Sequence, residues 1–529
     1  MRRRGMLIAG GSLLAAPWLA RAAAAGVAQD PGTLRFIPAA EPTVLDPHVT
    51  TAYSTRTHAL LVWDTLYGLD RDFVPRPQMA EGQEVADGGR LVLIRLREGL
   101  RFHDGAPVLA RDCVASIRRW ARHDPLGADL LARLDRLDAP DDRTIRFRLT
   151  RPFPLLFEAL GSTTPPVCAI LPERLASGRG PIGEVIGSGP YRFLAGEHES
   201  GLLLPYARFE DYLPRPGEEA SGTAGPKRAE FARIEWRPAA DPAEALAAIR
   251  SGAADWWQNP DPASRAALRR ERSVVLGAQD PLGLVAICRF NHLHPPFDSP
   301  AVRRAVLAGF GQAEMMASLM PGDRRLWRDR VGFFPPGTPY AAEAGLEPLF
   351  APADPVAARR ALAEAGYGGE RIVVLVPTDA PALGTLAQVG LDALRRMGFT
   401  AEAAAADWAT LMRRRMSHEP VSRGGWSVFF TLWAGADMRH PGIHQPLRAG
   451  GQRAWFGWPD SPEIEALREA WLDAAEEESR RRIAADLHAE AASALPYVPL
   501  GQAFAPMAVR RDILGVQPGL PLFWNIRRA

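Results

Sequence analysis

An acidic turn after an apolar stretch offers the clearest binding chemistry in the chain. Residues 428–432 are apolar and β-prone, which predicts a buried strand, and Asp437 stands in the turn that follows. Crevices beyond strand ends are where α/β folds usually bind ligands. A carboxylate there could form a charge-assisted hydrogen bond with a cationic ligand, and leaving it unpaired in a dry cleft is unfavourable. The alternative is that Asp437 only caps the turn.

Two histidines in the same segment have the spacing of a metal site. His440 and His444 lie four residues apart, which on a helix would place both imidazoles on one face. Pro441 and Gly442 lie between them, so a helix is disfavoured and the spacing loses its meaning. A metal site also needs further converging ligands, which the sequence does not place. We therefore expect no resident metal and no cofactor.

Aromatic side chains near turns form a second class of candidates. The chain has 14 Trp, and aromatic walls accept varied ligand groups through non-directional burial. Trp433, at the end of the predicted strand, is the aromatic residue that we favour for a pocket. Trp426, Tyr53 and Tyr67 are further candidates, and core packing is the alternative for each. Arg289 could meet a ligand carboxylate, although a surface salt bridge is the commoner fate of an arginine.

Sequence motifs of common enzymes are absent. The chain has no G-x-S-x-G, no H-E-x-x-H and no G-x-x-x-x-G-K-[ST]. No pattern places two carboxylates opposite each other as glycoside hydrolysis requires. The motif search therefore disfavours an enzyme and leaves a secreted hydrolase as an alternative function. Turnover of a broad substrate panel by the purified protein would revive that alternative.

The elements that must position these residues alternate between strand and helix. Residues 91–97 and 143–149 alternate between apolar and polar, as half-buried strands do. Asp241 and Asp354, each followed by proline, predict two helix starts. A strand over 372–376 and a helix over 380–397 predict a βαβ unit. The pattern indicates an α/β fold with mixed sheets.

The stretch 96–114 carries a family resemblance. It reads LREGLRFHDGAPVLARDCV, which predicts a strand end, a compact double turn and a helix start. The stretch closely resembles the signature of the family 5 extracellular solute-binding proteins, the peptide-, nickel- and opine-binding components of ABC importers. Further matches to that family follow its order along the chain, at 42–47 (PTVLDP), 187–191 (GSGPY), 291–305 and 495–500 (LPYVPL).

The resemblance implies a two-lobed periplasmic-binding-protein fold, α/β, of the large type II form with an extra subdomain inserted in lobe I. Ligand binding between the lobes would stabilise a closed form. Mapped here, lobe I comprises 26–52, 187–278 and 496–529, the inserted subdomain 53–186, and lobe II 279–495.

The resemblance also gives Asp437 and His440 a possible role. In peptide-binding relatives a Trp-x-x-Asp at this point sets a carboxylate against the α-ammonium of the ligand. Here Asp437 follows Trp433 by four residues, so strict alignment puts Ala436 on the anchor. The acidic residue common further downstream is replaced by His440. The implied ligand is a small molecule, first a di- or oligopeptide, with opine-like conjugates, oligosaccharides and nickel complexes left open. The implied partners are ABC permease subunits.

The N-terminus has the features of a signal peptide, which we place at residues 1–25. Three arginines precede an uncharged run and an A-x-A site, and the first residues approximate a twin-arginine motif. Cutting after Ala22 removes four arginines and no acid, which changes the formal net charge from +2 to −2. A near-neutral surface argues against a nucleic-acid role. We expect a periplasmic monomer.

Two remaining features concern order and redox state. Cys113, Cys168 and Cys288 are far apart in sequence, and we expect buried free thiols, although one disulfide is possible. The segment 214–227 is rich in proline, glycine and glutamate and is expected to be disordered. It ends at Lys227, the only lysine in the sequence.

Overall fold

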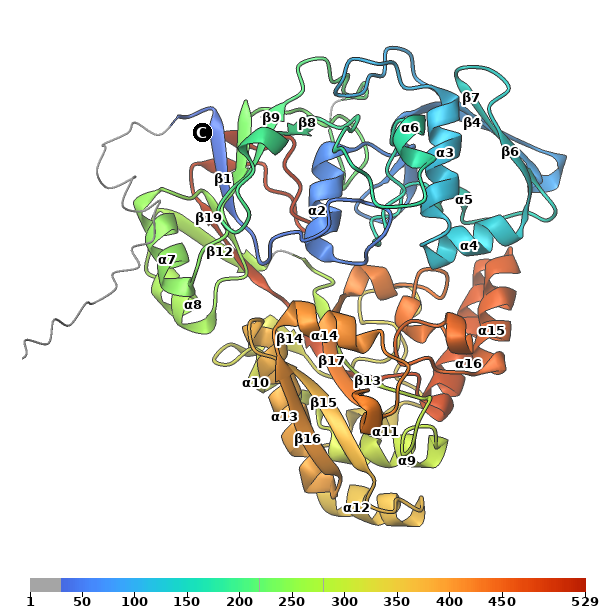
Figure 1. Ribbon diagram of the computed structural model, residues 1–529, viewed down its shortest axis with the longest axis vertical. Coiled ribbons are helices and arrows are strands. Elements are labelled where there is room, and N and C mark those ends of the chain that lie inside the picture. Colours follow the sequence, from blue (N-terminus) through green and yellow to red (C-terminus); the bar gives the residue numbers. More distant parts are fainter. Residues whose placement is uncertain (1–29, 218, 279) are drawn as a thin grey trace, which may run out of the picture.

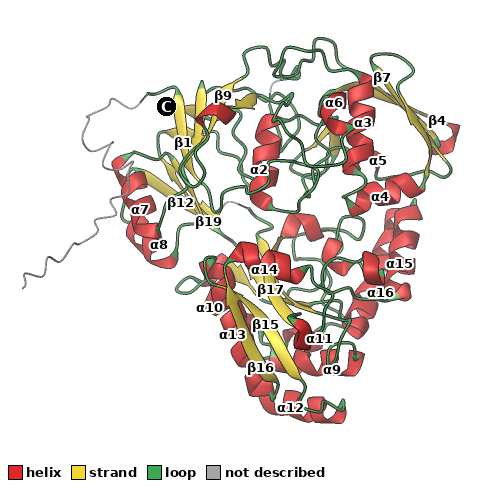
Figure 2. Cartoon of the chain, in the orientation of Figure 1, coloured by secondary structure: helices red, strands yellow, loops and turns green. Residues whose placement is uncertain are grey.

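The chain forms two lobes, each built on its own mixed sheet (Figure 1). The computed structural model describes residues 30–217, 219–278 and 280–529, so the predicted signal peptide lies outside the described residues. Lobe I has a seven-stranded sheet in the order β12-β19-β11-β1-β10-β9-β8. Lobe II has a six-stranded sheet in the order β14-β18-β13-β17-β15-β16. In Figure 2 the two main sheets lie in separate bodies with helices around each.

Lobe I packs an aromatic core against its sheet. The Phe36 ring lies 5.0 Å from Trp256 and 5.1 Å from Phe523 between centroids. Asp241 caps α7 by accepting from the Glu244 amide, as the sequence predicted. The lobe I elements are β1 (Thr33–Ile37), α2 (Tyr53–Val62), β8 (Tyr191–Phe193), β9 (Leu204–Arg208), β10 (Arg233–Trp236), α7 (Pro242–Ser251), β11 (Trp256–Gln258), α8 (Pro262–Leu268), β12 (Val274–Ala278), β19 (Pro506–Arg510), β20 (Ile513–Leu514) and β21 (Arg527–Arg528).

The inserted subdomain has a four-stranded antiparallel sheet in the order β4-β5-β7-β6. Val92, Ile94 and Leu96 of β5 are buried and their neighbours are more exposed, which confirms the predicted alternation. The elements between α2 and β8 are β2 (Tyr67–Leu69), β3 (Pro75–Pro77), β4 (Ala80–Ala86), β5 (Leu91–Leu96), α3 (Ala110–Trp120), α4 (Pro125–Ala132), β6 (Leu134–Asp138), β7 (Thr144–Leu149), α5 (Leu156–Ala159) and α6 (Glu173–Ala176).

The signature stretch is a structural corner that holds a second family motif in place. The His103 amide donates to the Gly187 carbonyl at 2.8 Å, and His103 Nε2 lies 3.0 Å from the Gly189 carbonyl oxygen. A Cβ on Gly187 would lie 2.0 Å from the Val62 carbonyl oxygen, so glycine is required for this close approach. The two motifs that carry the resemblance therefore meet in space.

Lobe II contains the predicted βαβ unit. β15 and β16 run parallel, α13 connects them, and Gly398 ends that helix with φ 102°. The lobe II elements are β13 (Leu284–Phe290), α9 (Pro300–Ala305), α10 (Gln312–Leu319), β14 (Trp327–Arg328), α11 (Glu347–Phe350), α12 (Pro355–Glu364), β15 (Arg371–Pro377), α13 (Pro381–Met397), β16 (Thr400–Ala406), α14 (Trp408–Arg415), β17 (Val428–Ala434), α15 (Pro462–Asp473), α16 (Glu477–Ala494) and β18 (Val498–Ala503).

Two of the expected domain boundaries do not coincide with the points where the chain passes from one sheet or core to another. β18 pairs with β13 in lobe II, whereas β19 pairs with β11 and β12 in lobe I. The chain therefore changes sheets between Ala503 and Pro506, not at residue 496. Leu61 and Val62 of α2 join the core of the seven-stranded sheet, as do Ala169, Leu171 and Ala176, so both ends of the segment expected to be inserted pack against that sheet.

The segment 214–227 is ordered in the part that the structure describes, which makes the disorder prediction wrong. Arg215 donates to the Ala80 carbonyl at 2.6 Å. Lys227 is 1% exposed, and its Nζ lies 2.7 Å from Asp64 Oδ1 and 4.7 Å from the centroid of the Trp524 ring. Polar and ionic contacts thus fix a segment that has no apolar periodicity.

The three cysteines are buried and unpaired, as expected. Within the described ranges, no helix has the length and apolar character needed to cross a bilayer.

Candidate functional site

Asp437 lies in the interface between the two lobes. It belongs to the short 3-10 turn Gly435–Met438 that follows β17. The Gly435 amide donates to the Gly283 carbonyl at 2.8 Å, and a Cβ on Gly435 would lie 2.1 Å from the Leu282 carbonyl oxygen. Glycine therefore lets this turn pack directly on the segment that leads from lobe I into β13. The turn sets the Asp437 carboxylate against lobe I.

Groups from lobe I surround the Asp437 carboxylate, whose residue is 0% exposed. Thr164 Oγ1 donates to Oδ1 at 2.9 Å, and Arg56 Nη1 lies 3.4 Å from Oδ2. The Tyr53 hydroxyl also interacts with this carboxylate, and it accepts a hydrogen bond from the Ala434 amide at 2.5 Å. The chain itself thus supplies a cation and two hydroxyls to the predicted anchor.

Burial controls the titration of this cluster. It raises the pKa of Asp437, against the opposing effect of Arg56 and of the Thr164 and Tyr53 hydrogen bonds. Burial and the nearby carboxylate hold the pKa of Tyr53 well above its usual range. Asp280 is a further carboxylate near Arg56, and burial raises its pKa as well. A cation is therefore favourable here, since two carboxylates share a dry interface.

His440 takes part in a second contact between the lobes. His440 Nε2 lies 2.6 Å from Glu158 Oε1 in the inserted subdomain, and Arg439 pairs with the same oxygen. The His440 ring stacks on Trp471 with 5.0 Å between centroids. Burial alone would raise the pKa of Glu158, but His440 and Arg439 together lower it to about 2. Burial lowers the pKa of His440.

Ion pairs also join the edges of the lobes. Arg133 of the inserted subdomain lies 2.6 Å from Glu469 and 3.1 Å from Asp473 on α15. Arg151 pairs with the same two acids. Arg448 of lobe II lies 3.4 Å from Asp129 of α4. The two lobes therefore meet through charged side chains around the buried Asp437 cluster.

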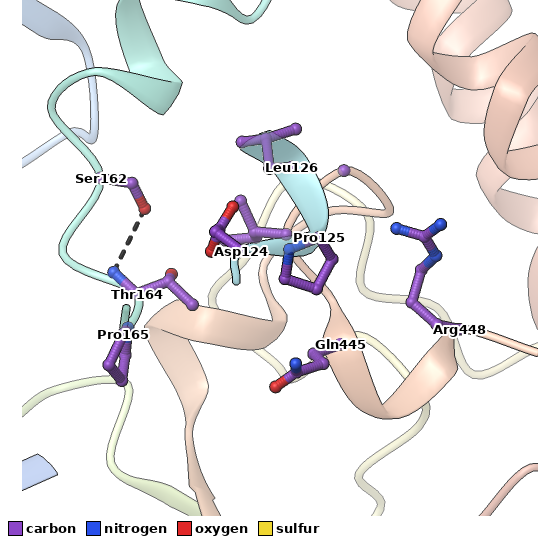
Figure 3. Close-up of a pocket in the computed structure, with 10 residues that line it drawn as sticks. Asp124, Pro125, Leu126, Ser162, Thr164, Pro165, Gln445 and Arg448 are labelled. Atoms are coloured by element: carbon purple, nitrogen blue, oxygen red, sulfur yellow. Dashed lines mark hydrogen bonds between the residues drawn. The ribbon is translucent and has the colours of Figure 1, made fainter. Parts of the chain in front are cut away.

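A small cavity lies between the lobes beside this cluster (Figure 3). Its volume of about 10 Å³ is close to the room needed for a single water molecule. Thr164, which donates to Asp437, lies in its wall. A cavity of this size has no room for a dipeptide. The lining residues are Asp124, Pro125, Leu126, Ser162, Thr164, Pro165, Gly442, Ile443, Gln445 and Arg448.

Three predicted residues lie away from these contacts. Trp433 is buried in lobe II, 5.1 Å from Trp455 between ring centroids, immediately before the Ala434 amide that contacts lobe I. Trp426 is also buried in lobe II and donates to the Arg415 carbonyl at 3.1 Å. Tyr67 is buried in lobe I and donates to Gln83 at 3.0 Å.

Arg289 is neither a surface residue nor part of the interface between the lobes. It is 0% exposed, and its guanidinium donates to four main-chain carbonyls inside lobe II, within 2.7–3.1 Å. Burial lowers its pKa to about 9. The sequence suggested a contact with a ligand carboxylate or a surface salt bridge, and the structure corrects both. Arg289 is a structural residue that holds several loops together. Its acceptors belong to Pro446, Trp455, Phe456 and Pro496.

His440 and His444 have different partners. His444 Nε2 lies 2.8 Å from the Phe333 carbonyl oxygen, and burial lowers the pKa of His444 to about 3. No group of three metal-ligating side chains occurs in the ranges that the structure describes.

Sequence reasoning missed Arg56, Thr164 and Glu158. A signal for Arg56 existed, because it lies three residues after the candidate Tyr53 and so faces the same side of α2. Thr164 and Glu158 lie in segments without a local motif, and only the tertiary fold brings them to Asp437 and His440.

Comparisons with known proteins agree with this architecture. The pattern of "Bacterial extracellular solute-binding proteins, family 5 Middle" matches residues 74–455. A probable peptide ABC transporter periplasmic-binding protein, y4tO of Sinorhizobium fredii, is 34% identical over 99% of this chain and 98% of its own length. The glutathione-binding protein GsiB of Escherichia coli K12 is 25% identical over 77% of this chain and 76% of its own.

Solved structures show the same fold. AgaA of A. tumefaciens R10 in complex with agropinic acid superposes with a TM-score of 0.80 at 20% identity, covering 94% of this chain and 99% of its own. A dipeptide-binding protein of Pseudoalteromonas sp. SM9913 in complex with Met-Leu gives 0.77 at 19% identity, covering 94% and 100%. The chain belongs to the family 5 extracellular solute-binding proteins, the non-enzymatic, periplasmic solute-binding components of ABC transporters.

Proposed function

We propose that this protein captures a di- or oligopeptide, or a related compound with a free ammonium group, between its lobes and delivers it to an ABC permease. It acts as a monomer with one solute per chain, after export through its signal peptide. Its relative y4tO is described as a probable peptide-binding protein. Opine-like conjugates are the second candidate, because AgaA has a similar fold and binds agropinic acid.

The observation that carries the proposal is the environment of Asp437. This buried carboxylate stands at the end of β17, and the opposite lobe supplies its cation, Arg56, at 3.4 Å. A contact of that length is longer than a good charge-assisted hydrogen bond. A ligand ammonium entering between the lobes would make a shorter bond to the same carboxylate. Binding would thereby favour the closed form through contacts that the open form lacks.

Native mass spectrometry of gently purified periplasmic protein tests the proposal. We expect one bound solute per chain and, after denaturation, release of a peptide or amino-acid conjugate with a free amino group. Asp437→Asn should lose this solute, whereas Glu469→Gln, at the exposed edge of the interface, should retain it. A released sugar or metal complex would exclude the ammonium-anchor proposal and leave the family unchanged. An empty protein would call for a thermal-shift screen across the same ligand classes.

A further inference from the structure

Arg56 is a buried cation with hydrogen-bonding capacity left over. Its residue is 6% exposed, and its Nε is buried without a hydrogen-bond partner. Its contact with Asp437 joins Nη1 and Oδ2 at 3.4 Å. The guanidinium carbon lies 4.3 Å from the centroid of the Tyr53 ring, a cation–π contact that fixes its position. A buried donor without an acceptor is unfavourable, so this side chain is suited to a ligand acceptor.

Arg56 and Asp437 present opposite charges to each other across the interface. If a ligand ammonium takes the Asp437 carboxylate, Arg56 loses its direct ion-pair partner while it stays buried. Asp280, the other carboxylate that acts on Arg56, already accepts the Leu282 amide at 2.8 Å through its Oδ1. A ligand that brings a carboxylate beside its ammonium compensates both buried charges at once.

We infer that the site takes a solute whose ammonium and carboxylate stand on the same carbon, with Asp437 binding the ammonium and Arg56 the carboxylate. Such a head group occurs in peptides joined through a side-chain carboxyl and in amino-acid conjugates. An α-linked peptide has a neutral amide carbonyl next to its ammonium and leaves Arg56 without a counter-charge. This inference rests on the proposed function and makes Arg56 a specificity-determining residue.

The matched probes are γ-L-glutamyl-L-alanine and its isomer α-L-glutamyl-L-alanine. They contain the same atoms, but only the γ isomer has a carboxylate on the carbon that bears the ammonium. Isothermal titration calorimetry of the whole mature protein should show the γ isomer binding at least about tenfold more tightly. Arg56→Met should abolish this preference. Arg56→Lys, which keeps the charge but not the planar guanidinium, should retain part of it.

Arg265→Met is the control variant. Arg265 is also a buried arginine of lobe I that faces lobe II, but its Nη1 contacts the sulfur of Met320 at 3.6 Å. This variant should keep the preference for the γ isomer.

Three results would overturn the inference. If the only role of Arg56 is to pair with the Asp437 carboxylate in the solute-free protein, Arg56→Met will bind both isomers more tightly, and the inference is overturned. Equal affinities in the unmodified protein overturn it as well, and so does binding of neither isomer. The importer proposal is judged separately, by the identity of the solute that co-purifies. Thermal unfolding of Arg56→Met and Arg56→Lys identifies a variant that fails to fold.

Discussion

The Tyr53 hydroxyl accepts a hydrogen bond from the Ala434 amide at 2.5 Å, although 381 residues separate them in the sequence. Tyr53 is the first residue of α2 in lobe I, and Ala434 is the last residue of β17 in lobe II. The same hydroxyl interacts with Asp437 three residues further on. One side chain therefore contacts both the end of the strand and the carboxylate that the strand positions.

Tyr53→Phe should weaken the closed form. The substitution leaves the Ala434 amide without its acceptor, and an unsatisfied buried donor costs about 1–3 kcal/mol. Solute affinity should fall by roughly five- to hundredfold, measured by calorimetry with the co-purifying solute. Tyr67→Phe is the matched control, because the Tyr67 hydroxyl bonds Gln83 within lobe I. An equal loss in both variants would contradict the assignment.

Acid should open the lobes by weakening the contacts of Glu158 and His440. Asp437, whose pKa burial raises, opposes this opening because it holds a proton more readily when the lobes are closed. In the closed structure the pKa of Glu158 is lowered from 4.5 to about 2, so closing releases a proton from this group. The stabilisation of the closed form is thus complete above pH 4.5 and lost as the pH falls towards 2. Burial also lowers the pKa of His440 from 6.5. Protonation of His440 therefore destabilises the closed form as well, and this destabilisation begins at a higher pH than that of Glu158.

Small-angle scattering of the solute-bound protein measures this opening as an increase in the radius of gyration. Glu158→Gln cannot ionise and should remove the part of the transition below pH 4.5. An unchanged radius between neutral and strongly acidic pH would argue against these contacts as part of closure.

The edge ion pairs should contribute unequally to closure. The Arg133 side chain is 1% exposed, whereas the Arg151 side chain is 44% exposed. Both pair with Glu469 and Asp473. Arg151→Met should change the solute affinity by less than about 1 kcal/mol, as exposed pairs do. Replacing both acids by amides leaves Arg133 buried without a counter-charge and should cost several times more. Calorimetry at low and high salt should show a larger salt effect for the exposed pair.

Arg289→Met should destabilise lobe II without changing solute affinity. The substitution leaves four buried carbonyls without their donor, and we expect a loss of roughly 3 kcal/mol or more in the free energy of unfolding. Urea denaturation measures it. Arg371→Met, which removes an exposed pair with Glu402, is the control and should be close to neutral. A specific loss of affinity in the folded Arg289 variant would restore this residue to the binding site.

Local patterns predicted the elements, because capping and periodicity are written in neighbouring residues. The cap at Asp241, the helix end at Gly398 and the strand before Asp437 all depend on residues a few positions apart. The partners of Asp437, by contrast, are far from it in the sequence. Thr164 lies 273 residues away and Arg56 381, so which groups surround the carboxylate depends on how the lobes close.

The errors have the same origin. Arg289 lies within a buried strand, and nothing in its neighbours shows that distant loops present carbonyls to it. The segment 214–227 has the composition of a disordered chain, but Lys227 meets a buried carboxylate that belongs to another part of lobe I. A tertiary ion pair can order a segment whose own sequence gives no reason for order.

The burial of Lys227 has a practical consequence for chemical labelling. Because this residue is the only lysine and is 1% exposed, amine-reactive reagents should modify the folded protein at its α-amino group alone. A dye or a surface can therefore be coupled at one end without altering either lobe. Unfolding releases Lys227 from Asp64 and Trp524. The fraction of molecules with a second modified amine would therefore report the fraction that has unfolded.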